Sequence, residues 1–348
     1  MARLSIEGKF LTQALTGTQR YSAEMVREID AICEEGDFEL VVPESAIIRN
    51  QLCLKRIPVI RSGKHNGPIW MHFDFTRYCK RVGTVPLCFG NIAPILSKCI
   101  VTIHDVSPRA NIGFYSWQFR SYQDICTRLN VKNAQVILTD TYFSKREIEH
   151  YYPAAKGKIK VVKCGWQHMN RIERDDAALD KFGLEADNYW FALSSLTPNK
   201  NLRWIAETAK LNPDDRFAVA GGCNSRTFGK RETPTTPNMD YLGYVTDGEA
   251  KALMKHCKGF IYPTFYEGFG LPPMEAMASG ARLCIVGDNP CMHEVYGGSV
   301  AYIDPTVPCD NISNIAKPSV ASVDNVLKQY SWRKSAEDLM CILKGIVQ

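Results

Sequence analysis

Short runs of β-branched and aromatic residues alternate with longer amphipathic stretches along this chain, a pattern typical of doubly wound α/β proteins with parallel sheets. At 348 residues the chain is too long for one comfortable hydrophobic core, so we expect two domains. The first half predicts strands over 38–43, 99–104, 134–139 and 158–162, and helices over 18–34, 69–81, 117–129 and 144–151. The second half predicts strands over 189–194, 216–220, 239–242, 259–262, 282–286 and 300–303, and helices over 171–184, 202–211, 247–256, 272–279, 290–296 and 332–346.

The seam between the two domains is expected near residues 165–170. It separates an N-terminal domain over 1–166 from a C-terminal domain over 167–331. The composition, with 45% hydrophobic and 23% charged residues, is that of an ordinary globular protein. No apolar run approaches the roughly 18 residues of a membrane-spanning helix, and the first residues lack the apolar core of a secretory signal.

The cysteines indicate a reducing environment. There are 13 of them without a CxxC pair, and most lie in apolar surroundings. Such a pattern favours free, buried thiols over disulfides or zinc ligands. We therefore expect a cytoplasmic protein that holds no structural zinc.

The charge is unevenly distributed between the two halves. Residues 1–165 carry 23 lysines and arginines against 15 acidic residues, whereas residues 166–348 carry 19 against 22. A basic first half favours an anionic substrate or peripheral association with an anionic membrane surface, and a merely solvated basic face is the alternative. Nucleic acid is disfavoured because the basic clusters lack interleaved aromatic residues and any known binding signature.

The stretch 265–280 is a glycine loop that leads into a proline-started helix, with carboxylates at Glu267 and Glu275. Gly268 and Gly270 allow the backbone to turn and to approach a ligand closely. The free amides and the dipole of the helix start, beginning at Pro272, favour a phosphate. Hydroxyl-rich groups on either side of that phosphate suit the two carboxylates, so a nucleotide sugar fits this motif.

Two other interpretations of this stretch stay open at this point. The first is an ordinary loop and helix, since short motifs match often by chance. The second is a hydrolytic carboxylate pair like that of glycosidases, although such chemistry requires neither the glycine loop nor the helix start.

Further candidate residues follow strands of the second half, where open α/β sheets bind ligands. Lys200, in the loop 194–202, suits a diphosphate as a point charge, with a solvated lysine as the alternative. Gly221 ends another strand with bare backbone, and Tyr244 follows a third strand, where it is placed to line a nucleobase. Both of the latter positions also read as ordinary turns.

In the first half, Gly17 opens a helix in a second glycine loop where backbone can meet a phosphate or an acceptor. His104 and Asp105 end the strand 99–104, and a neutral His104 can hydrogen bond to a sugar hydroxyl. A catalytic base is a second interpretation, without a Ser or Cys nucleophile motif to support it. A core or capping histidine is a third.

Taken in order, these motifs resemble the family 4 glycosyltransferases, which are retaining enzymes of the GT-B fold and are also described as glycosyl transferases group 1. The paired-glutamate motif is the most specific of them. The resemblance extends along nearly the whole chain, through segments 17–21, 86–94, 102–108, 140–148, 194–202, 267–275 and 330–332.

The resemblance implies two Rossmann-like domains that face a cleft, with a C-terminal helix over 332–348 that crosses back to the N-terminal domain. By similarity, Glu275 would bind ribose hydroxyls and Glu267 a hydroxyl of the donor sugar. Lys200 would neutralise the diphosphate and His104 would contact the donor sugar, so that His104, Lys200 and Glu267 form the catalytic group. The other expected donor-binding residues are Gly17, Asp105, Gly221, Tyr244, Gly268, Phe269, Gly270, Leu271 and Glu275.

The family often carries an arginine close to the lysine, but Ser194, Ser195 and Asn199 stand in this region of the chain. We expect Arg20 or Arg226 to supply the missing charge.

The resemblance further implies hexosyl transfer from a UDP-, GDP- or dTDP-sugar to a glycan or lipid-linked oligosaccharide, with retention and without a metal or other cofactor. A catalytically inactive nucleotide-sugar-binding partner subunit and a phosphorylase-type GT-B enzyme are the alternatives.

Overall fold

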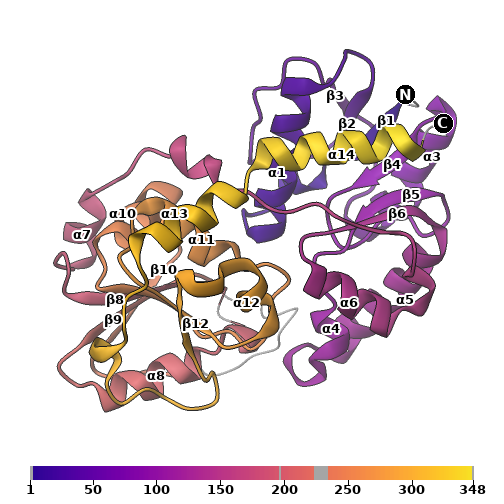
Figure 1. Cartoon of the computed structure of the whole chain (residues 1–348). Coiled ribbons are helices and arrows are strands. Elements are labelled where there is room, and N and C mark those ends of the chain that lie inside the picture. Colours follow the sequence, from indigo (N-terminus) through magenta and orange to yellow (C-terminus); the bar gives the residue numbers. More distant parts are fainter. Residues whose placement is uncertain (1–2, 196, 223–233, 347–348) are drawn as a thin grey trace. The chain divides into compact units, whose positions relative to one another are not determined.

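The computed structural model describes residues 3–195, 197–222 and 234–346 (Figure 1). The chain forms two compact units, and each of them contains one parallel sheet. The first unit comprises Met1–Arg109, Arg120–Gly165 and Ser331–Gln348, and the second comprises Ala110–Phe119 and Trp166–Tyr330. The division falls at Gly165 and Tyr330, one residue before each expected domain boundary, but residues 110–119, expected in the N-terminal domain, belong to the second unit.

The first unit has a seven-stranded sheet in the order β3-β2-β1-β4-β5-β6-β7. Neighbouring strands pair in parallel throughout this sheet. Parallel strands need crossover connections, which the helices of this unit supply. The strands are β1 (Leu4–Glu7), β2 (Phe38–Val42), β3 (Val59–Arg61), β4 (Val85–Cys88), β5 (Cys99–Thr102), β6 (Ala134–Thr139) and β7 (Ile159–Val161).

Helices of the first unit follow the predicted pattern with one irregularity. The helix expected over 69–81 is a short α2 (Gly67–Ile69), a π-helical turn (Trp70–Phe75) and α3 (Thr76–Val82) in succession. The remaining helices are α1 (Gly17–Ile32), α4 (Ser107–Ala110), α5 (Trp117–Asn133), α6 (Tyr142–Tyr151) and α14 (Trp332–Ile346).

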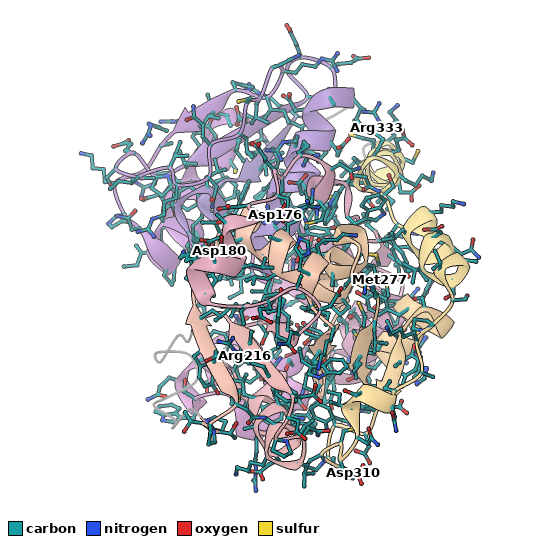
Figure 2. All side chains as sticks on the ribbon, turned by 90° about the vertical axis from the view of Figure 1, so that its left-hand side faces the viewer. Asp176, Asp180, Arg216, Met277, Asp310 and Arg333 are labelled. Atoms are coloured by element: carbon teal, nitrogen blue, oxygen red, sulfur yellow. The ribbon has the colours of Figure 1, made fainter. Side chains whose placement is uncertain are left out.

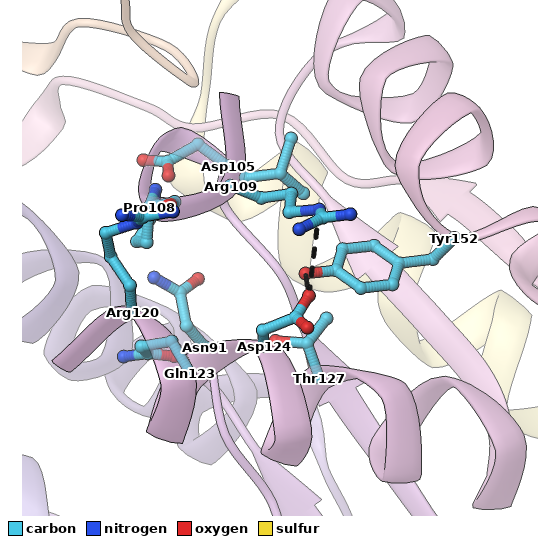
Figure 3. A pocket seen from close by; sticks show the side chains of 10 residues that line it. Asn91, Asp105, Pro108, Arg109, Arg120, Gln123, Asp124, Thr127 and Tyr152 are labelled. Carbon is cyan, nitrogen blue, oxygen red and sulfur yellow. Dashed lines mark hydrogen bonds and ion pairs between the residues drawn. The ribbon is translucent and has the colours of Figure 1, made fainter. Parts of the chain in front are cut away.

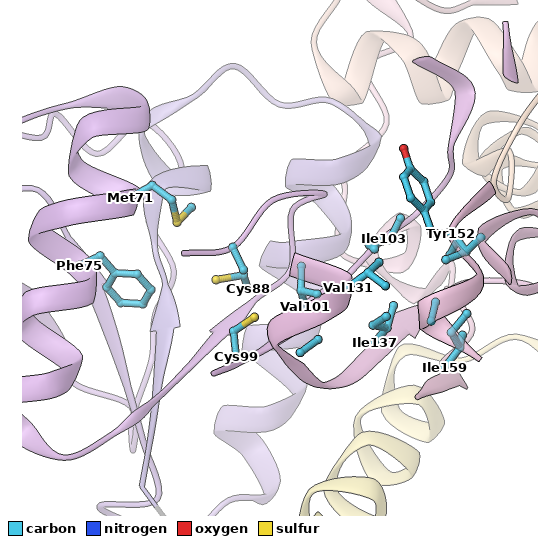
Figure 4. Close-up of a cluster of buried hydrophobic side chains, with 14 of the residues drawn as sticks. Met71, Phe75, Cys88, Cys99, Val101, Ile103, Val131, Ile137, Tyr152 and Ile159 are labelled. Carbon is cyan, nitrogen blue, oxygen red and sulfur yellow. The ribbon is translucent and has the colours of Figure 1, made fainter. Parts of the chain in front are cut away.

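The core of the first unit lies between its central strands and the helices that cover them (Figure 4). Strand residues such as Val101 and Ile137 are fully buried there, and Phe75 from the π-helical turn belongs to the same core. Cys88 and Cys99 are also buried, and burial raises the pKa of both thiols, that of Cys99 to about 12. Every cysteine in the described part of the chain is a free thiol.

The second unit has a six-stranded parallel sheet in the order β10-β9-β8-β11-β12-β13. Its core is built around Trp190, Trp204, Phe217 and Ile285. The strands are β8 (Tyr189–Leu193), β9 (Arg216–Ala220), β10 (Met239–Gly243), β11 (Gly259–Tyr262), β12 (Cys284–Gly287) and β13 (Ala301–Ile303). The helices are α7 (Ala177–Phe182), α8 (Leu202–Leu211), α10 (Asp247–His256), α11 (Leu271–Ser279), α12 (Pro290–Tyr296) and α13 (Val320–Gln329).

Helix α14 packs in the first unit, although the whole second unit precedes it in sequence. It lies alongside α1 (Figure 1), with the ring of the fully buried Trp332 centred 5.7 Å from that of Tyr21. The Ser335 hydroxyl donates to the carbonyl oxygen of Lys163 at 2.5 Å. Two parallel α/β units with such a returning helix confirm the expected fold class.

The prediction of a helix over 171–184 is wrong for the first half of this range, because the only helix within it is α7 (Ala177–Phe182). The preceding backbone bonds elsewhere instead: Lys251 donates from Nζ to the carbonyl oxygens of Met169 and Ile172, and the amide of Asp175 donates to the carbonyl of Gly248. Within the described residues, no helix is both apolar enough and long enough to span a membrane.

Candidate active site

The glycine loop of the second unit leads into α11 in a geometry that only glycine adopts readily. Gly270, the N-cap, has φ of 84°, and a Cβ there would lie 2.6 Å from the terminal methyl of Met292. Pro272 and Pro273 occupy the first turn, which suits proline because the first amides of a helix have no partner within it. The hydroxyl of Tyr296 donates to the carbonyl oxygen of Gly270 and holds the loop against α12.

Phe269 and the side chains of α11 fix this helix on the sheet. The ring of Phe269 is buried and lies edge-on to that of Tyr330, with 5.3 Å between centroids. Met277 is also buried and contributes to the packing of α11 (Figure 2). Because Met277 follows Glu275 by two positions, the two side chains leave the helix on opposite sides, and Glu275 faces away from that buried contact.

Lys200 and Glu267 meet directly in the second unit. Lys200 ends the short 3₁₀ turn after β8, and its Nζ lies 2.6 Å from Oε1 of Glu267 and 2.7 Å from the hydroxyl of Tyr262. Burial, and then the neighbouring carboxylate of Glu267, raise the pKa of Tyr262 well above its usual value. Tyr262 therefore stays a neutral phenol whose oxygen accepts from the ammonium group.

The turn that carries Lys200 is fixed by Asn201, which adopts a left-handed backbone with φ of 56°. Its side-chain amide donates to the carbonyl oxygens of Pro263 and Pro305, at 3.0 and 2.7 Å. The amide of Phe265 donates to the carbonyl of Asn199. The turn and the glycine loop are thus tied together through the backbone.

Glu275 is paired with His168, a residue that sequence reasoning missed. Nε2 of His168 lies 2.9 Å from Oε1 of Glu275, and the side chains are 2% and 15% exposed respectively. His168 belongs to the 3₁₀ turn Gln167–Asn170, which directly follows the crossing from the first unit. No motif marks this histidine, so only its spatial position identifies it.

Gly221 and Tyr244 follow β9 and β10, at the carboxyl edge that also carries Lys200. Gly221 has φ of 135°, and a Cβ there would lie 1.8 Å from the carbonyl oxygen of Ser194, so a larger residue cannot fit without movement of the backbone. The amide of Gly221 donates to the carbonyl of Gly243. Tyr244 is 71% exposed and presents its ring to solvent beside these bare backbone segments.

His104 is held from four directions in the first unit. Its Nδ1 lies 2.7 Å from Oδ2 of Asp140 and its Nε2 lies 2.9 Å from the carbonyl oxygen of Phe89. Its amide donates to Oδ1 of Asn91, and its carbonyl accepts from the hydroxyl of Ser144. Both ring nitrogens are therefore engaged within this unit.

The environment of His104 favours its charged form. Burial alone would lower the pKa of His104, but the charge and hydrogen bond of Asp140, the carbonyl of Phe89 and the charge of Asp105 together raise it. An imidazolium that donates from both nitrogens matches a carboxylate on one side and a carbonyl on the other. Asp140 was not among the predicted site residues, although it opens the motif 140–148.

Gly17 and Asp105 lie elsewhere in the first unit. Gly17 is the first residue of α1, and a Cβ there would meet no other atom within 4 Å, so the space beside it is open. Asp105 accepts from the amide of Ser107 at 2.8 Å and lines a hollow between the end of β5 and α5. Of the two arginines expected to supply charge, Arg20 lies in α1, and Arg226 falls outside the described residues.

The hollow beside Asp105 carries several polar side chains (Figure 3). Asp124 is its most connected group: it accepts from the hydroxyl of Tyr152 at 2.9 Å and from Nε of Arg128 at 2.8 Å, and it lies 3.9 Å from Nε of Arg109. Burial tends to raise the pKa of Asp124, but these partners lower it overall. The lining residues are Asn91, Asp105, Val106, Pro108, Arg109, Arg120, Gln123, Asp124, Thr127 and Tyr152.

Two parallel α/β units with a C-terminal helix that returns to the first define a GT-B fold. Solved structures support this class. Sucrose-phosphate synthase from Thermosynechococcus elongatus aligns with a TM-score of 0.73 at 12% identity, over 100% of this chain and 99% of that one. HepE from Anabaena, solved in complex with UDP-glucose, aligns with a TM-score of 0.73 at 12% identity, over 99% and 100%. At this identity the likeness establishes the fold alone.

Sequence comparisons are more specific about the second unit. Residues 175–301 match the family described as glycosyl transferases group 1. The O-antigen chain mannosyltransferase RfbU of Salmonella typhimurium is 28% identical over 61% of this chain and 58% of its own length. O-antigen chain mannosyltransferase B of Escherichia coli is 27% identical over 69% and 64%. The matches thus span less than two thirds of the length of either relative.

Proposed function

We propose that this protein is a glycosyltransferase that moves a hexosyl group from a nucleoside diphosphate sugar to a hydroxyl of a glycan acceptor, in the synthesis of a surface polysaccharide. The observation that carries the proposal is the group at the carboxyl edge of the second sheet. There Lys200 and Glu267 form one pair, Glu275 lies on α11, and the glycine loop leads directly into the start of that helix. The match of residues 175–301 to group 1 glycosyl transferases covers most of this group.

In this proposal the diphosphate of the donor lies at the start of α11, where backbone amides and the helix dipole favour negative charge. Glu275 accepts hydrogen bonds from the ribose hydroxyls. The backbone of Phe269, Gly270 and Leu271 lies against the phosphate and the sugar. Tyr244, exposed at the end of β10, is placed to contact the nucleobase.

Lys200 exchanges partners when the donor binds. Before binding, its charge is neutralised by Glu267 at 2.6 Å. The diphosphate as a whole brings more negative charge than one carboxylate, so the ammonium group moves toward the phosphate. Glu267 is then released to accept a hydrogen bond from a hydroxyl of the donor sugar. Lys200 would thus bind the diphosphate on one side of the scissile bond, and Glu267 the sugar on the other side.

Transfer proceeds with retention and without a metal in this proposal. Lys200 and the amides of α11 stabilise the charge that develops on the departing nucleoside diphosphate. The acceptor hydroxyl attacks from the face that the diphosphate leaves, and a departing phosphate oxygen takes its proton. Because both ring nitrogens and the amide of His104 are engaged within the first unit, we assign its contact with the sugar to the backbone carbonyl, which has a second lone pair beside the one that Ser144 uses.

The sugar is proposed to be mannose, because both curated relatives are mannosyltransferases by name. The base stays open between uridine, guanosine and thymidine: HepE was solved with UDP-glucose, but its identity to this chain is only 12%. The acceptor is proposed to use the hollow beside Asp105, whose amide, carboxylate and guanidinium groups match the hydroxyls of a saccharide.

Peripheral association with an anionic membrane remains part of the proposal. On the run Gly67–Val82, Ile69 and Phe73 are 53% and 62% exposed, and Arg77, Lys80 and Arg81 are exposed just beyond them. Apolar and basic side chains side by side suit the interface of an anionic bilayer. Flotation of the protein with vesicles that contain anionic lipid, compared with neutral vesicles, tests this point.

The test of the function has two steps. A thermal-shift screen of UDP, GDP and dTDP identifies the base, since a bound ligand raises stability by RT ln(1 + [L]/Kd). Turnover of the corresponding mannosyl and glucosyl donors with a saccharide acceptor then tests transfer, and proton NMR of the product establishes the anomeric configuration. Nucleotide binding without turnover of any donor would instead favour an inactive binding subunit.

A further inference from the structure

Three consecutive residues bind two different parts of the second unit just after the chain enters it. Nε1 of Trp166 donates to the carbonyl of Leu327 at 2.7 Å, and the side-chain amide of Gln167 donates to the carbonyl of Tyr330 at 2.9 Å. Both acceptors lie at the end of α13 and just beyond it. His168 reaches the other way, to Glu275 on α11. The first two contacts anchor the segment from which the third one extends.

The backbone around His168 is fixed as well. The amide of Arg171 donates to the carbonyl of His168 at 3.0 Å, and the carbonyl of Met169 accepts from Lys251 at 2.6 Å. With only 2% of its side chain exposed, the His168 ring has no room to leave its position. The imidazole is therefore a rigid partner, and the glutamate at the end of its own flexible chain is the group that becomes ordered.

We propose that His168 is a positioning residue, which holds the carboxylate of Glu275 in the orientation that binds the ribose hydroxyls of the donor. The inference rests on the proposed function, because it presupposes that Glu275 meets a ribose. His168 itself does not touch the ligand. A glutamate side chain loses rotamer freedom when it is ordered, and a hydrogen bond formed before binding removes that cost from the binding step.

The chemistry of the pair limits what His168 can do. One carboxylate oxygen of Glu275 is engaged by the imidazole at 2.9 Å, so the plane of the carboxylate is set by a buried donor. A vicinal diol binds a carboxylate through two hydroxyls at once, which makes its binding sensitive to that plane. A ligand that lacks one of these hydroxyls, or the whole ribose, is much less sensitive to it.

The experiment compares His168→Leu, which keeps the bulk without a donor, with His168→Gln, whose amide can replace Nε2. Calorimetry measures the Kd of UDP and GDP, of their 2′-deoxy counterparts and of inorganic pyrophosphate. We expect His168→Leu to weaken the ribonucleotide that binds wild type by about 10-fold or more, as for a lost hydrogen bond to a charged group. The loss is smaller for the 2′-deoxynucleotide, absent for pyrophosphate, and partly restored in His168→Gln.

A double-mutant cycle with Glu275→Gln tests whether His168 acts through that residue. If it does, the double variant binds ribonucleotides no more weakly than Glu275→Gln alone. His256→Leu is the matched control, because His256 also contacts a carboxylate, Asp176 at 3.1 Å, but in a pair that is more exposed. The control should leave every Kd unchanged.

The possible outcomes separate cleanly. Unchanged ribonucleotide affinity in His168→Leu, or equal losses for ribonucleotide and pyrophosphate, overturns the positioning role. Should His168→Leu not fold, His168→Gln and its double variant with Glu275→Gln still give the cycle, and additive losses there also overturn the inference. Wild type that binds neither UDP nor GDP, nor any other nucleotide of the screen, refutes the proposed function itself, and the inference falls with it.

Discussion

The ammonium nitrogen of Lys200 lies 2.6 Å from a carboxylate oxygen of Glu267, and the two side chains are only 15% and 11% exposed. The pair keeps both charges compensated, where burial would otherwise make each of them costly. Under the proposed function, each residue is the partner that the other leaves when a charged ligand binds. The affinity for a diphosphate would then reflect an exchange of partners rather than the simple addition of one contact.

Lys200→Met should therefore lower kcat/KM for the donor by roughly 10- to 150-fold, which corresponds to the 1.5–3 kcal/mol of a hydrogen bond to a charged group. Steady-state kinetics with the donor varied would measure it. Lys210→Met is the matched control, because Lys210 pairs with Glu207 at an exposed position on α8. Full activity of Lys200→Met would show that the diphosphate is held elsewhere.

Glu267→Gln should have opposite effects on binding and on turnover. The amide is a weaker competitor for Lys200, so inorganic pyrophosphate and the nucleoside diphosphate should bind more tightly than in wild type. Turnover of the nucleotide sugar should fall, because a charged acceptor for the sugar hydroxyl is lost. Calorimetry and kcat together test this prediction, and weaker binding of pyrophosphate would contradict the exchange of partners.

Gly270→Ala should destabilise the protein more than Gly183→Ala does. Both glycines have a positive φ, 84° and 60°, and a non-glycine residue in that region costs about 1–2 kcal/mol. Only Gly270 has a close neighbour in addition, since its new Cβ would meet Met292 at 2.6 Å, whereas Gly183 has nothing within 4 Å. The difference between the two denaturation midpoints measures the packing part, and equal shifts would refute it.

The pair of His104 and Asp140 should make stability depend on pH. The pKa of His104 is raised in the folded state, above the value of about 6.5 in an unfolded chain. The resulting stabilisation is fully present below about pH 6.5 and is lost as the pH rises through the folded-state pKa. Wild type should therefore lose stability relative to Asp140→Asn as the pH increases above about 6.5. Parallel pH profiles of the two free energies of unfolding would contradict this.

Much of the fold could be predicted because its signals are local. Helix α10 begins and ends as expected, and in the structure Thr246 and Glu249 form a reciprocal cap at its start. Strands β1, β3 and β4 were not predicted, and β4 contains Pro86, which weakens its strand pattern. Such strands are defined by their neighbours in the sheet rather than by their own pattern.

The candidate site shows the same division. Glu267, Gly270 and Glu275 lie within one contiguous motif, and the geometry of Gly270 could be read from residue type alone. His168 and Asp140 could not be found in this way. Each acts through a partner 107 or 36 positions away, and no spacing rule connects such residues before the sheets are assembled.

The packing of α14 against α1 has a consequence for folding during synthesis. The first unit lacks one of the ring neighbours of Tyr21 until Trp332 has been made, and every residue of the second unit is synthesised before Trp332. The first unit therefore begins the chain but receives its last helix only after the second unit has been synthesised. During translation, the side of α1 that packs against α14 stays uncovered until after the last residue of the second unit has been synthesised.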